Sequence, residues 1–207
     1  MTSTVTPGAR KILDAAARLF YDRGLTAVGV DLVAREAGVT KKTLYDRFGS
    51  KDALVTAYLR ERDERWRAWL TAEVERRAET PYGRLIATFD ALGEWMRRQN
   101  PRGCGFVNAA AELPDPGHPA RAVITGQKRW LRGRLRELAV AAGADDPDRL
   151  ADELALLHEG AIVLGGLSVA GQDGAGQDGA GQGGADPVVT ARALAVRALG
   201  EAGCRPE

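Results

Sequence analysis

Cysteine, histidine and aromatic residues are scarce in this chain of 207 residues. It holds two cysteines, Cys104 and Cys204, and two histidines, His118 and His158. Two distant cysteines exclude a disulfide framework, and the spacing of these four residues matches no metal-binding pattern. We therefore expect neither a metal nor a cofactor. The same scarcity argues against an enzyme, because no nucleophile motif accompanies the histidines.

Long hydrophobic runs are missing as well. No segment approaches the ~18 consecutive apolar residues of a membrane-spanning helix, and the N-terminus has no apolar signal region. Strand-like alternation of apolar and polar residues is also absent. We expect a cytoplasmic protein without a membrane partner, made of helices that pack on one another because there is no sheet to cover them.

Charge is small in total but uneven along the chain. The formal net charge is +1. Residues 1–51 hold nine Lys or Arg and five Asp or Glu, a net of +4, which leaves −3 for the remainder. A basic N-terminal segment on a slightly acidic body favours nucleic-acid binding by that segment. A chance asymmetry of this size is also compatible with the composition.

Residues 30–48 have the layout of two short helices joined by a tight turn. One face of the first helix is apolar and is formed by Val30, Val33, Ala34 and Ala37. Gly38 then tolerates the left-handed conformation that often ends a helix, and the hydroxyl of Thr40 can cap the next helix. Leu44 and Phe48 lie on the inner face of that second helix. This is the layout of a helix-turn-helix, whose second helix enters the DNA major groove.

The outer face of the second helix carries side chains that can donate hydrogen bonds to phosphates or base edges. They are Lys41, Lys42, Thr43, Tyr45 and Arg47. Asp46, on the same helix, would repel phosphates. For this segment alone, an ordinary helical hairpin with a solvated basic face remains an alternative. Flanking signals favour the DNA-binding interpretation: Thr6, Pro7 and Gly24 bound an upstream helix, and Ser50 can cap a long downstream one.

Many residues between about positions 9 and 60 agree with a known pattern at fixed spacing. They are Ile12–Ala16 with Leu19, Phe20 and Gly24, then Val33–Thr40, then Thr43, Leu44, Tyr45, Phe48, Ser50 and Lys51. This pattern resembles the DNA-binding domain of the TetR/AcrR family of bacterial regulators, and residues 102–114 resemble a subgroup of that family. The family usually has Thr or Ser ahead of the first motif helix. Gly29 stands there in this chain and offers no hydroxyl to a phosphate.

The resemblance implies an all-α fold of about nine helices in two domains. We expect residues 1–50 to form a three-helix DNA-binding domain, with the motif at about 30–49. Residues 51–207 would form a helical ligand-binding and dimerisation domain. The implied function is sequence-specific transcriptional regulation, as a repressor that a small-molecule effector releases from a near-palindromic operator in double-stranded DNA.

The resemblance also implies a dimer. Its two recognition helices would occupy successive major grooves about 34–36 Å apart. The DNA-binding candidates are Thr40, Lys41, Lys42, Thr43, Tyr45, Arg47 and Lys51. We expect residues 41–43 to lie closest to the bases. Tyr45 and Lys51 would hold phosphates, Lys51 with the help of the N-terminus of its own helix.

Beyond residue 50 the apolar spacing predicts only helices. Their approximate ranges are 51–79, a helix starting at Pro81, 103–112, 118–142, 147–169 and 187–203. Helices 147–169 and 187–203 are more apolar than solvated helices would be. The corresponding helices of the family form a four-helix bundle between two subunits, so we expect a homodimer through them. The alternative is that the rest of the same chain covers them.

A pentapeptide of the type Ala-Gly-Gln-Asp-Gly is repeated three times over residues 170–184. Its abundant glycine and low apolar content predict a flexible loop at 170–185. Expansion of a tolerated surface loop explains the repeat without assigning it a function.

The resemblance also implies a small-molecule pocket in the helical body. The candidates are Phe89, Trp95, Met96, Phe106, Asn108, Trp130 and His158. Aromatic residues at helical spacing equally suit a plain core. Asn108 and His158 stand out because a polar group buried among apolar helices needs a partner, which can be a ligand, a water or another side chain.

Two other functions remain open. One is a helical scaffold that binds protein, which would lack the steep loss of affinity with salt that marks DNA binding. The other is a small helical enzyme that uses Glu112 and His158, although no sequence motif supports it.

Overall fold

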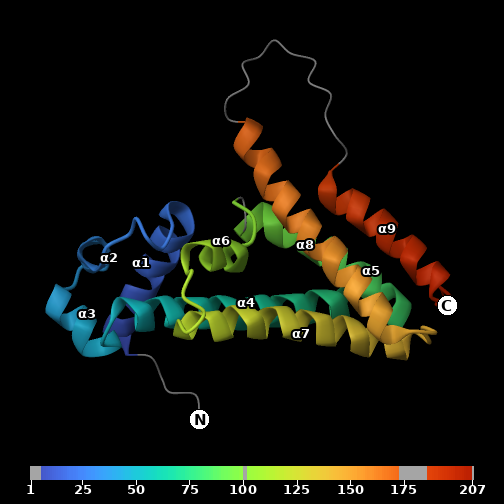
Figure 1. Ribbon diagram of the computed structural model, residues 1–207, viewed down its shortest axis with the longest axis horizontal. Coiled ribbons are helices and arrows are strands. Elements are labelled where there is room, and N and C mark those ends of the chain that lie inside the picture. Colours follow the sequence, from blue (N-terminus) through green and yellow to red (C-terminus); the bar gives the residue numbers. More distant parts are fainter. Residues whose placement is uncertain (1–5, 100–101, 173–185, 207) are drawn as a thin grey trace. The chain divides into compact units, whose positions relative to one another are not determined.

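The computed structural model describes residues 6–99, 102–172 and 186–206, and every regular element within these ranges is a helix (Figure 1). The helices are α1 (Pro7–Arg23), α2 (Val30–Glu36), α3 (Lys41–Phe48), α4 (Lys51–Arg77), α5 (Pro81–Gln99), α6 (Gly105–Glu112), α7 (Pro119–Ala141), α8 (Pro147–Gln172) and α9 (Pro187–Glu201). The prediction of an all-α fold with about nine helices is confirmed. The flexible loop predicted at 170–185 begins too early, since α8 continues to Gln172, and the rest of it, residues 173–185, lies outside the described residues.

The chain divides into two compact units. Unit 1 comprises Met1–Arg65 and Gly105–Gly126, and unit 2 comprises Trp66–Cys104 and Gln127–Glu207. The N-terminal parts of α4 and α7 therefore belong to unit 1, and their C-terminal parts belong to unit 2. A functional boundary near residue 50 stays a prediction about which residues read DNA.

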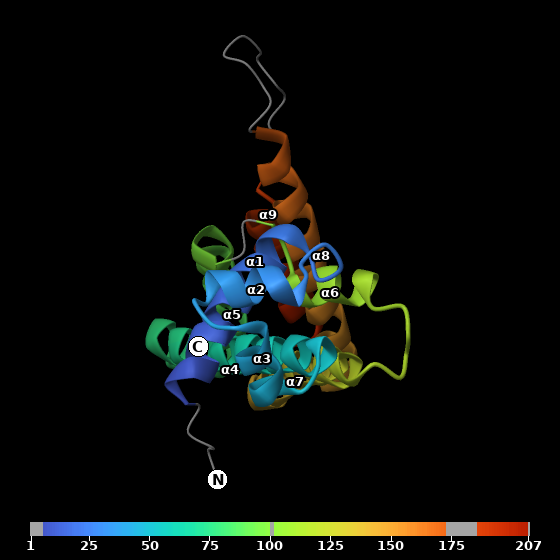
Figure 2. The same cartoon turned by 90° about the vertical axis from the view of Figure 1, so that its left-hand side faces the viewer.

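In unit 1, α1, α2 and α3 pack on one another (Figure 2). Helix α1 is amphipathic, and its buried face includes Ile12, Ala16 and Phe20. Val33 of α2 and Leu44 of α3 are fully buried. Burial of these apolar side chains holds the two short helices α2 and α3 against α1, because helices of seven or eight residues are not stable in isolation.

The turn between α2 and α3 has the geometry that its sequence predicts. Gly38 has a φ of 64°, a conformation that L side chains rarely adopt. The N–H of Val39 donates to the carbonyl of Ala34 at 2.9 Å. The hydroxyl of Thr40 accepts the N–H of Thr43 at 3.1 Å and so caps α3. These bonds satisfy backbone groups that the end of one helix and the start of the next leave open.

The other predicted caps are present too. The hydroxyl of Thr6 accepts the N–H of Ala9 at the start of α1, and Ser50 accepts the N–H of Ala53 at 3.0 Å at the start of α4. Gly29 precedes α2 without a side-chain cap. Sequence signals of this kind are reliable because a cap joins residues only two or three positions apart.

A carboxylate from α6 holds the turn that follows α1. Glu112 accepts the backbone N–H of Thr26 at 2.7 Å. A side chain at Gly24 would collide with this carboxylate, since an added Cβ would lie 2.9 Å from Glu112 Oε1. Burial raises the pKa of the Glu112 carboxyl, but hydrogen bonds from the backbone N–H groups of Thr26 and Leu25 outweigh burial, and the pKa is lowered.

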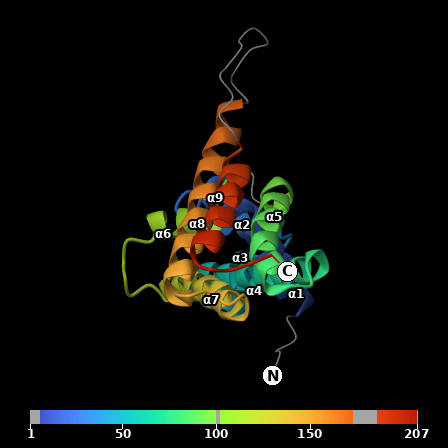
Figure 3. The ribbon, with the colours of Figure 1, turned by 90° about the vertical axis from the view of Figure 1, so that its right-hand side faces the viewer.

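In unit 2, α8 packs along α9, and α5 packs against both (Figure 3). Phe89 and Leu92 of α5, Leu154 of α8 and Leu199 of α9 are fully buried. The backbones of α8 and the segment before α6 approach closely, because a Cβ at Gly166 would lie 2.6 Å from backbone atoms of Gly103. Glycine is required there for lack of space.

Replacing Glu112 with Gln tests the carboxylate that holds the Thr26 turn. We expect the free energy of unfolding to fall by about 1 kcal/mol at pH 7, because charge-assisted hydrogen bonds are lost. Since the folded pKa lies below the unfolded one, this contribution is present above the unfolded pKa and disappears as pH falls through the folded pKa.

Urea unfolding followed by circular dichroism at pH 7 and in acid measures both effects. Glu137→Gln is the matched control, because that carboxylate is 68% exposed and pairs with the nearby Arg134 at 3.3 Å. A Glu112→Gln chain as stable as the native one at pH 7 would contradict the assignment.

Candidate nucleic-acid interface

The predicted DNA-binding residues lie on α3 or at its two flanks, all within unit 1. Thr40, Lys41, Lys42, Tyr45 and Arg47 are exposed, and Thr43 and Lys51 are half-buried. Leu44 points the other way and is fully buried. Helix α3 therefore presents one polar, predominantly basic face to solvent and uses the opposite face to pack.

Two lysines of this face are paired with carboxylates when DNA is absent. Lys41 Nζ lies 3.0 Å from Asp31 of α2, and Lys42 Nζ lies 2.8 Å from Asp46 one turn along α3. The hydrogen bond to Asp31 raises the pKa of Lys41. Because all four side chains are more than half exposed, water screens these pairs and a phosphate can replace either carboxylate.

The remaining groups are held by local bonds. The hydroxyls of Thr40 and Thr43 lie 2.9 Å apart, so Thr43 is oriented by the same residue that caps α3. Tyr45 is 40% exposed although its ring is apolar. Lys51 is the first residue of α4, and its charge contributes to the lowered pKa of Glu112. Its ammonium thus lies near a helix N-terminus, a position that attracts anions.

Sequence reasoning missed two features of this interface. The pairing of Lys41 with Asp31 joins α3 to α2, so no local spacing reveals it. Glu112 is far away in sequence but holds the backbone just before α2. The pairing of Lys42 with Asp46 was accessible from the sequence, since their spacing of four places them on one helical face.

The seven predicted pocket residues do not all belong to the same unit. Phe89, Trp95, Met96, Trp130 and His158 lie in unit 2, whereas Phe106 and Asn108 lie in unit 1. Asn108 is exposed, so the expectation that it is a buried polar group is wrong. Helix α6 buries Gly105, Phe106 and Ala109, and Asn108 lies off that face.

His158 is buried, as expected, and it lies in an aromatic cluster of unit 2. Its ring centroid is 5.9 Å from that of Trp66 and 5.9 Å from that of Phe89. Trp95 extends the cluster, with centroid distances of 5.2 Å to Trp66 and 5.7 Å to Trp69. Trp66 and Trp69 were not among the predicted pocket residues. Their spacing of three along α4 was the available signal.

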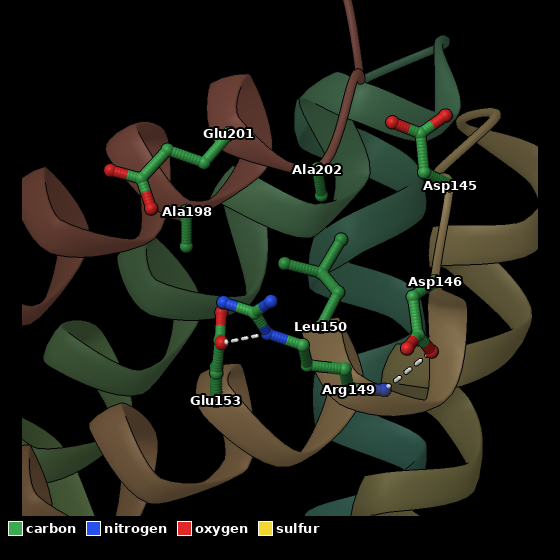
Figure 4. Close-up of a pocket in the computed structure, with 8 residues that line it drawn as sticks. All are labelled: Asp145, Asp146, Arg149, Leu150, Glu153, Ala198, Glu201 and Ala202. Carbon is green, nitrogen blue, oxygen red and sulfur yellow. Dashed lines mark hydrogen bonds and ion pairs between the residues drawn. The ribbon is translucent and has the colours of Figure 1, made fainter.

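Two surface hollows in unit 2 offer some volume. The first, of about 240 Å³, lies between the start of α8 and the end of α9 and is lined by Asp145, Asp146, Arg149, Leu150, Glu153, Ala198, Glu201 and Ala202 (Figure 4). Arg149 turns to Glu153 at 2.8 Å, so the hollow is acidic and unsuited to an anion. The second, of about 200 Å³, includes Phe89 among its lining residues.

The part of the chain that the structure describes holds neither a metal-ligand cluster nor a membrane-spanning helix. No group of three or more His, Cys, Asp or Glu side chains there is arranged to hold a metal ion. No described helix is long and apolar enough to cross a bilayer.

Comparison with known proteins identifies the family. Residues 12–58 match the model of bacterial regulatory proteins of the tetR family. Residues 81–172 match the tetracyclin repressor-like C-terminal domain. The HTH-type transcriptional regulator MT1294 of Mycobacterium tuberculosis is 31% identical over 169 residues, covering 73% of this chain and 82% of that protein.

Two further proteins agree with this result. The HTH-type transcriptional regulator YjdC of Escherichia coli is 27% identical over 154 residues, covering 73% of this chain and 79% of its own. The crystal structure of SCO4454, a TetR-family transcriptional regulator from Streptomyces coelicolor, superposes with a TM-score of 0.80 at 29% identity, covering 94% of this chain and 95% of that one. The chain belongs to the TetR family of helix-turn-helix transcriptional regulators.

Proposed function

We propose that this protein is a dimeric, sequence-specific DNA-binding repressor that a small-molecule effector releases from a near-palindromic operator. The observation that carries the proposal is the exposed basic face of α3, which a buried Leu44 and a capped turn hold in a fixed orientation. A helix presented in this way fits the major groove, where side-chain donors meet base edges and phosphates.

Within that interface the residues divide by role. Lys41, Lys42 and Thr43 form the first turn of α3 and lie closest to the bases, as recognition helices contact bases near their N-termini. Tyr45 and Lys51 bind phosphates and set the register, and Arg47 adds a further cation. On binding, phosphates displace Asp31 and Asp46 from the two paired lysines.

Dimerisation uses α8 and α9. Leu156, Val163 and Leu167 of α8 are 75%, 40% and 66% exposed, and they recur at spacings of seven and four on one face. Val189 and Val196 of α9 are 61% and 37% exposed and are seven residues apart. Apolar faces on two adjacent helices are expensive to leave in water, and a second copy related by two-fold symmetry buries both at once.

Effector control follows from differential affinity. An effector that binds better to a dimer with misplaced recognition helices lowers DNA affinity, because only such a difference can shift the equilibrium. We infer a binding protein and not an enzyme. The enzyme alternative would need the Glu112 carboxylate, which already accepts the backbone N–H of Thr26.

The test is selection of bound fragments from a random DNA pool by the purified full chain, followed by affinity measurements against salt. Enrichment of a near-palindrome with half-sites one helical turn apart, and a slope of log K against log salt near −0.9 per phosphate neutralised, are the expected results. Transcription in vitro from a promoter carrying that site then shows the sign of regulation. Absence of both enrichment and salt dependence would favour the scaffold alternative.

Three substitutions separate base reading from phosphate binding. Tyr45→Phe and Lys51→Ala should weaken binding to all sequences alike, and Lys51→Ala should reduce the salt slope by about 1. Lys42→Ala should cost about 1–3 kcal/mol on the selected operator and relax the preferred sequence. Fluorescence anisotropy on the operator and on single-base variants gives these values. Equal losses on every sequence for all three variants would contradict the assigned roles.

Leu156→Glu tests the dimer. Burying an uncompensated carboxylate in the α8 and α9 interface should weaken dimerisation by about 3 kcal/mol or more and should lower operator affinity as a consequence. Sedimentation equilibrium reports the association constant. Val140→Glu is the matched control, since Val140 is 53% exposed and lies on α7, which is not one of the two helices of the proposed interface. Equal dimerisation of both variants and the native chain would refute the interface.

A further inference from the structure

Four side chains of unit 2 have buried polar atoms to which no described residue hydrogen-bonds. The atoms are Nε1 of Trp66, Nε1 of Trp69, Oε1 of Gln127 and both ring nitrogens of His158. Buried polar atoms in native proteins are almost always hydrogen-bonded, because leaving one unpaired forfeits its interaction with water. Several such atoms in one unit therefore call for a partner that the described residues do not supply.

Three of these side chains belong to one aromatic cluster. Trp66 and Trp69 come from α4, Trp95 from α5 and His158 from α8, with neighbouring ring centroids 5.2 to 5.9 Å apart. His158 is 0% exposed and Trp66 is 4% exposed. The unpaired nitrogens therefore lie among aromatic rings, which suit a flat apolar molecule.

Donors outnumber acceptors among the unpaired atoms of the cluster. Each indole N–H is a donor and cannot accept. Burial lowers the pKa of His158 to about 3, and the nearby Lys128 ammonium acts in the same direction. The imidazole is therefore neutral at physiological pH and offers one donor and one acceptor. A partner that satisfies the cluster must bring acceptor atoms, and oxygen is the common choice.

Charge limits the partner further. The Lys128 ammonium lies 2.7 Å from both carboxylate oxygens of Glu159. The Arg98 guanidinium lies 5.9 Å from the Trp69 ring centroid and pairs with Glu94 at 2.6 Å, so each cation already has a counter-ion. A charged ligand among these rings would lose its hydration without gaining a free counter-ion. An uncharged ligand avoids that cost.

We propose that the unpaired nitrogens of His158, Trp66 and Trp69 are the polar anchor of the effector site, and that the effector is a neutral aromatic molecule bearing hydroxyl or carbonyl oxygen. This inference rests on the proposed function, since it identifies the chemistry of the ligand that controls DNA binding. The aromatic rings contact the apolar part of the ligand, and the nitrogens of the three side chains form hydrogen bonds with its oxygen atoms.

The aromatic cluster is partly accessible from the surface of unit 2. Trp69 and Trp95 are only half-buried, so the cluster extends from the buried imidazole to the surface. Met96, also half-buried, packs against Gly165 of α8. Methionine is unbranched and adapts to new neighbours, so it can move aside as a small ring enters.

The test measures binding of three matched probes to the full chain by isothermal titration calorimetry. 4-Hydroxyacetophenone carries both oxygen functions, 4-ethyltoluene has a similar shape without oxygen, and 4-hydroxybenzoate adds a negative charge. We expect 4-hydroxyacetophenone to bind more tightly than either of the others by about tenfold or more, which corresponds to one good hydrogen bond or one uncompensated charge.

His158→Phe removes the anchor but keeps an aromatic ring. We expect it to weaken 4-hydroxyacetophenone binding about tenfold and to raise Tm by about 3 °C, because two unpaired buried nitrogens disappear. His118→Phe is the control. The Nδ1 atom of His118 accepts the N–H of Ala120 at 3.1 Å, so that variant should lose stability and keep the native affinity for the probe.

A second variant guards against a misfolded His158→Phe chain. Trp66→Phe removes one indole donor from the same cluster and should also weaken 4-hydroxyacetophenone more than 4-ethyltoluene. The proposal is overturned if the native chain binds the oxygen-bearing probe no better than 4-ethyltoluene, or if the carboxylate binds best. It is also overturned if both variants keep the native affinity.

Failure of this inference and failure of the proposed function are distinguishable. Calorimetry of the probes needs no DNA, and operator selection needs no probe. A chain that reads an operator but ignores the probes refutes only the effector chemistry. A chain that binds the probe but no DNA refutes the regulator and leaves the anchor intact.

Discussion

The orientation of α3 depends on a single short turn. Gly38 takes up a left-handed conformation, and Thr40 caps the helix two residues later. These two residues decide where α3 starts, and full burial of Leu44 decides which side of it faces inward. A helix of eight residues has too little intrinsic stability to hold its own direction. The basic face is thus available to DNA because packing on the opposite face leaves α3 no other orientation.

Packing also determines which faces of α8 and α9 are buried, but it covers these two helices less completely. Helices α8 and α9 pack on each other and on α5, yet Leu156, Leu167 and Val189 keep more than half of their surface in water. Packing within one chain has therefore covered only part of the apolar surface of these helices. In the proposed dimer, a second copy related by two-fold symmetry covers the apolar surface that folding leaves exposed.

Unit 2 also contains a conflict between stability and binding. An aromatic cluster would be more stable with phenylalanine in place of a neutral, unpaired histidine, since each unpaired nitrogen costs free energy. Natural sequences are locally consistent except where function requires otherwise. The exposed ion pairs of Lys41 and Lys42 also combine order with binding. The carboxylates hold the two lysines in place, and phosphates can still displace those carboxylates.

Local interactions made much of this protein predictable from the sequence alone. Helix starts at Pro7, Pro81 and Pro187, the cap at Thr40 and the turn at Gly38 each depend on residues within four positions, so their patterns are readable without a structure. The position of the second motif helix follows from the turn and the cap, and the all-α class follows from helical apolar spacing without strand-like alternation. The buried position of Leu44 also follows, because helical periodicity places it opposite the basic side chains.

Only the tertiary structure could decide contacts between distant segments. The bond of Glu112 to Thr26 spans 86 positions, and the pair of Lys41 with Asp31 joins two helices. Asn108 and His158 looked alike in the sequence as polar residues on apolar helices, but packing left one exposed and the other wholly buried without a partner. Periodicity determines the faces of a helix. Which face is covered, and by what, depends on neighbours that come from elsewhere in the chain.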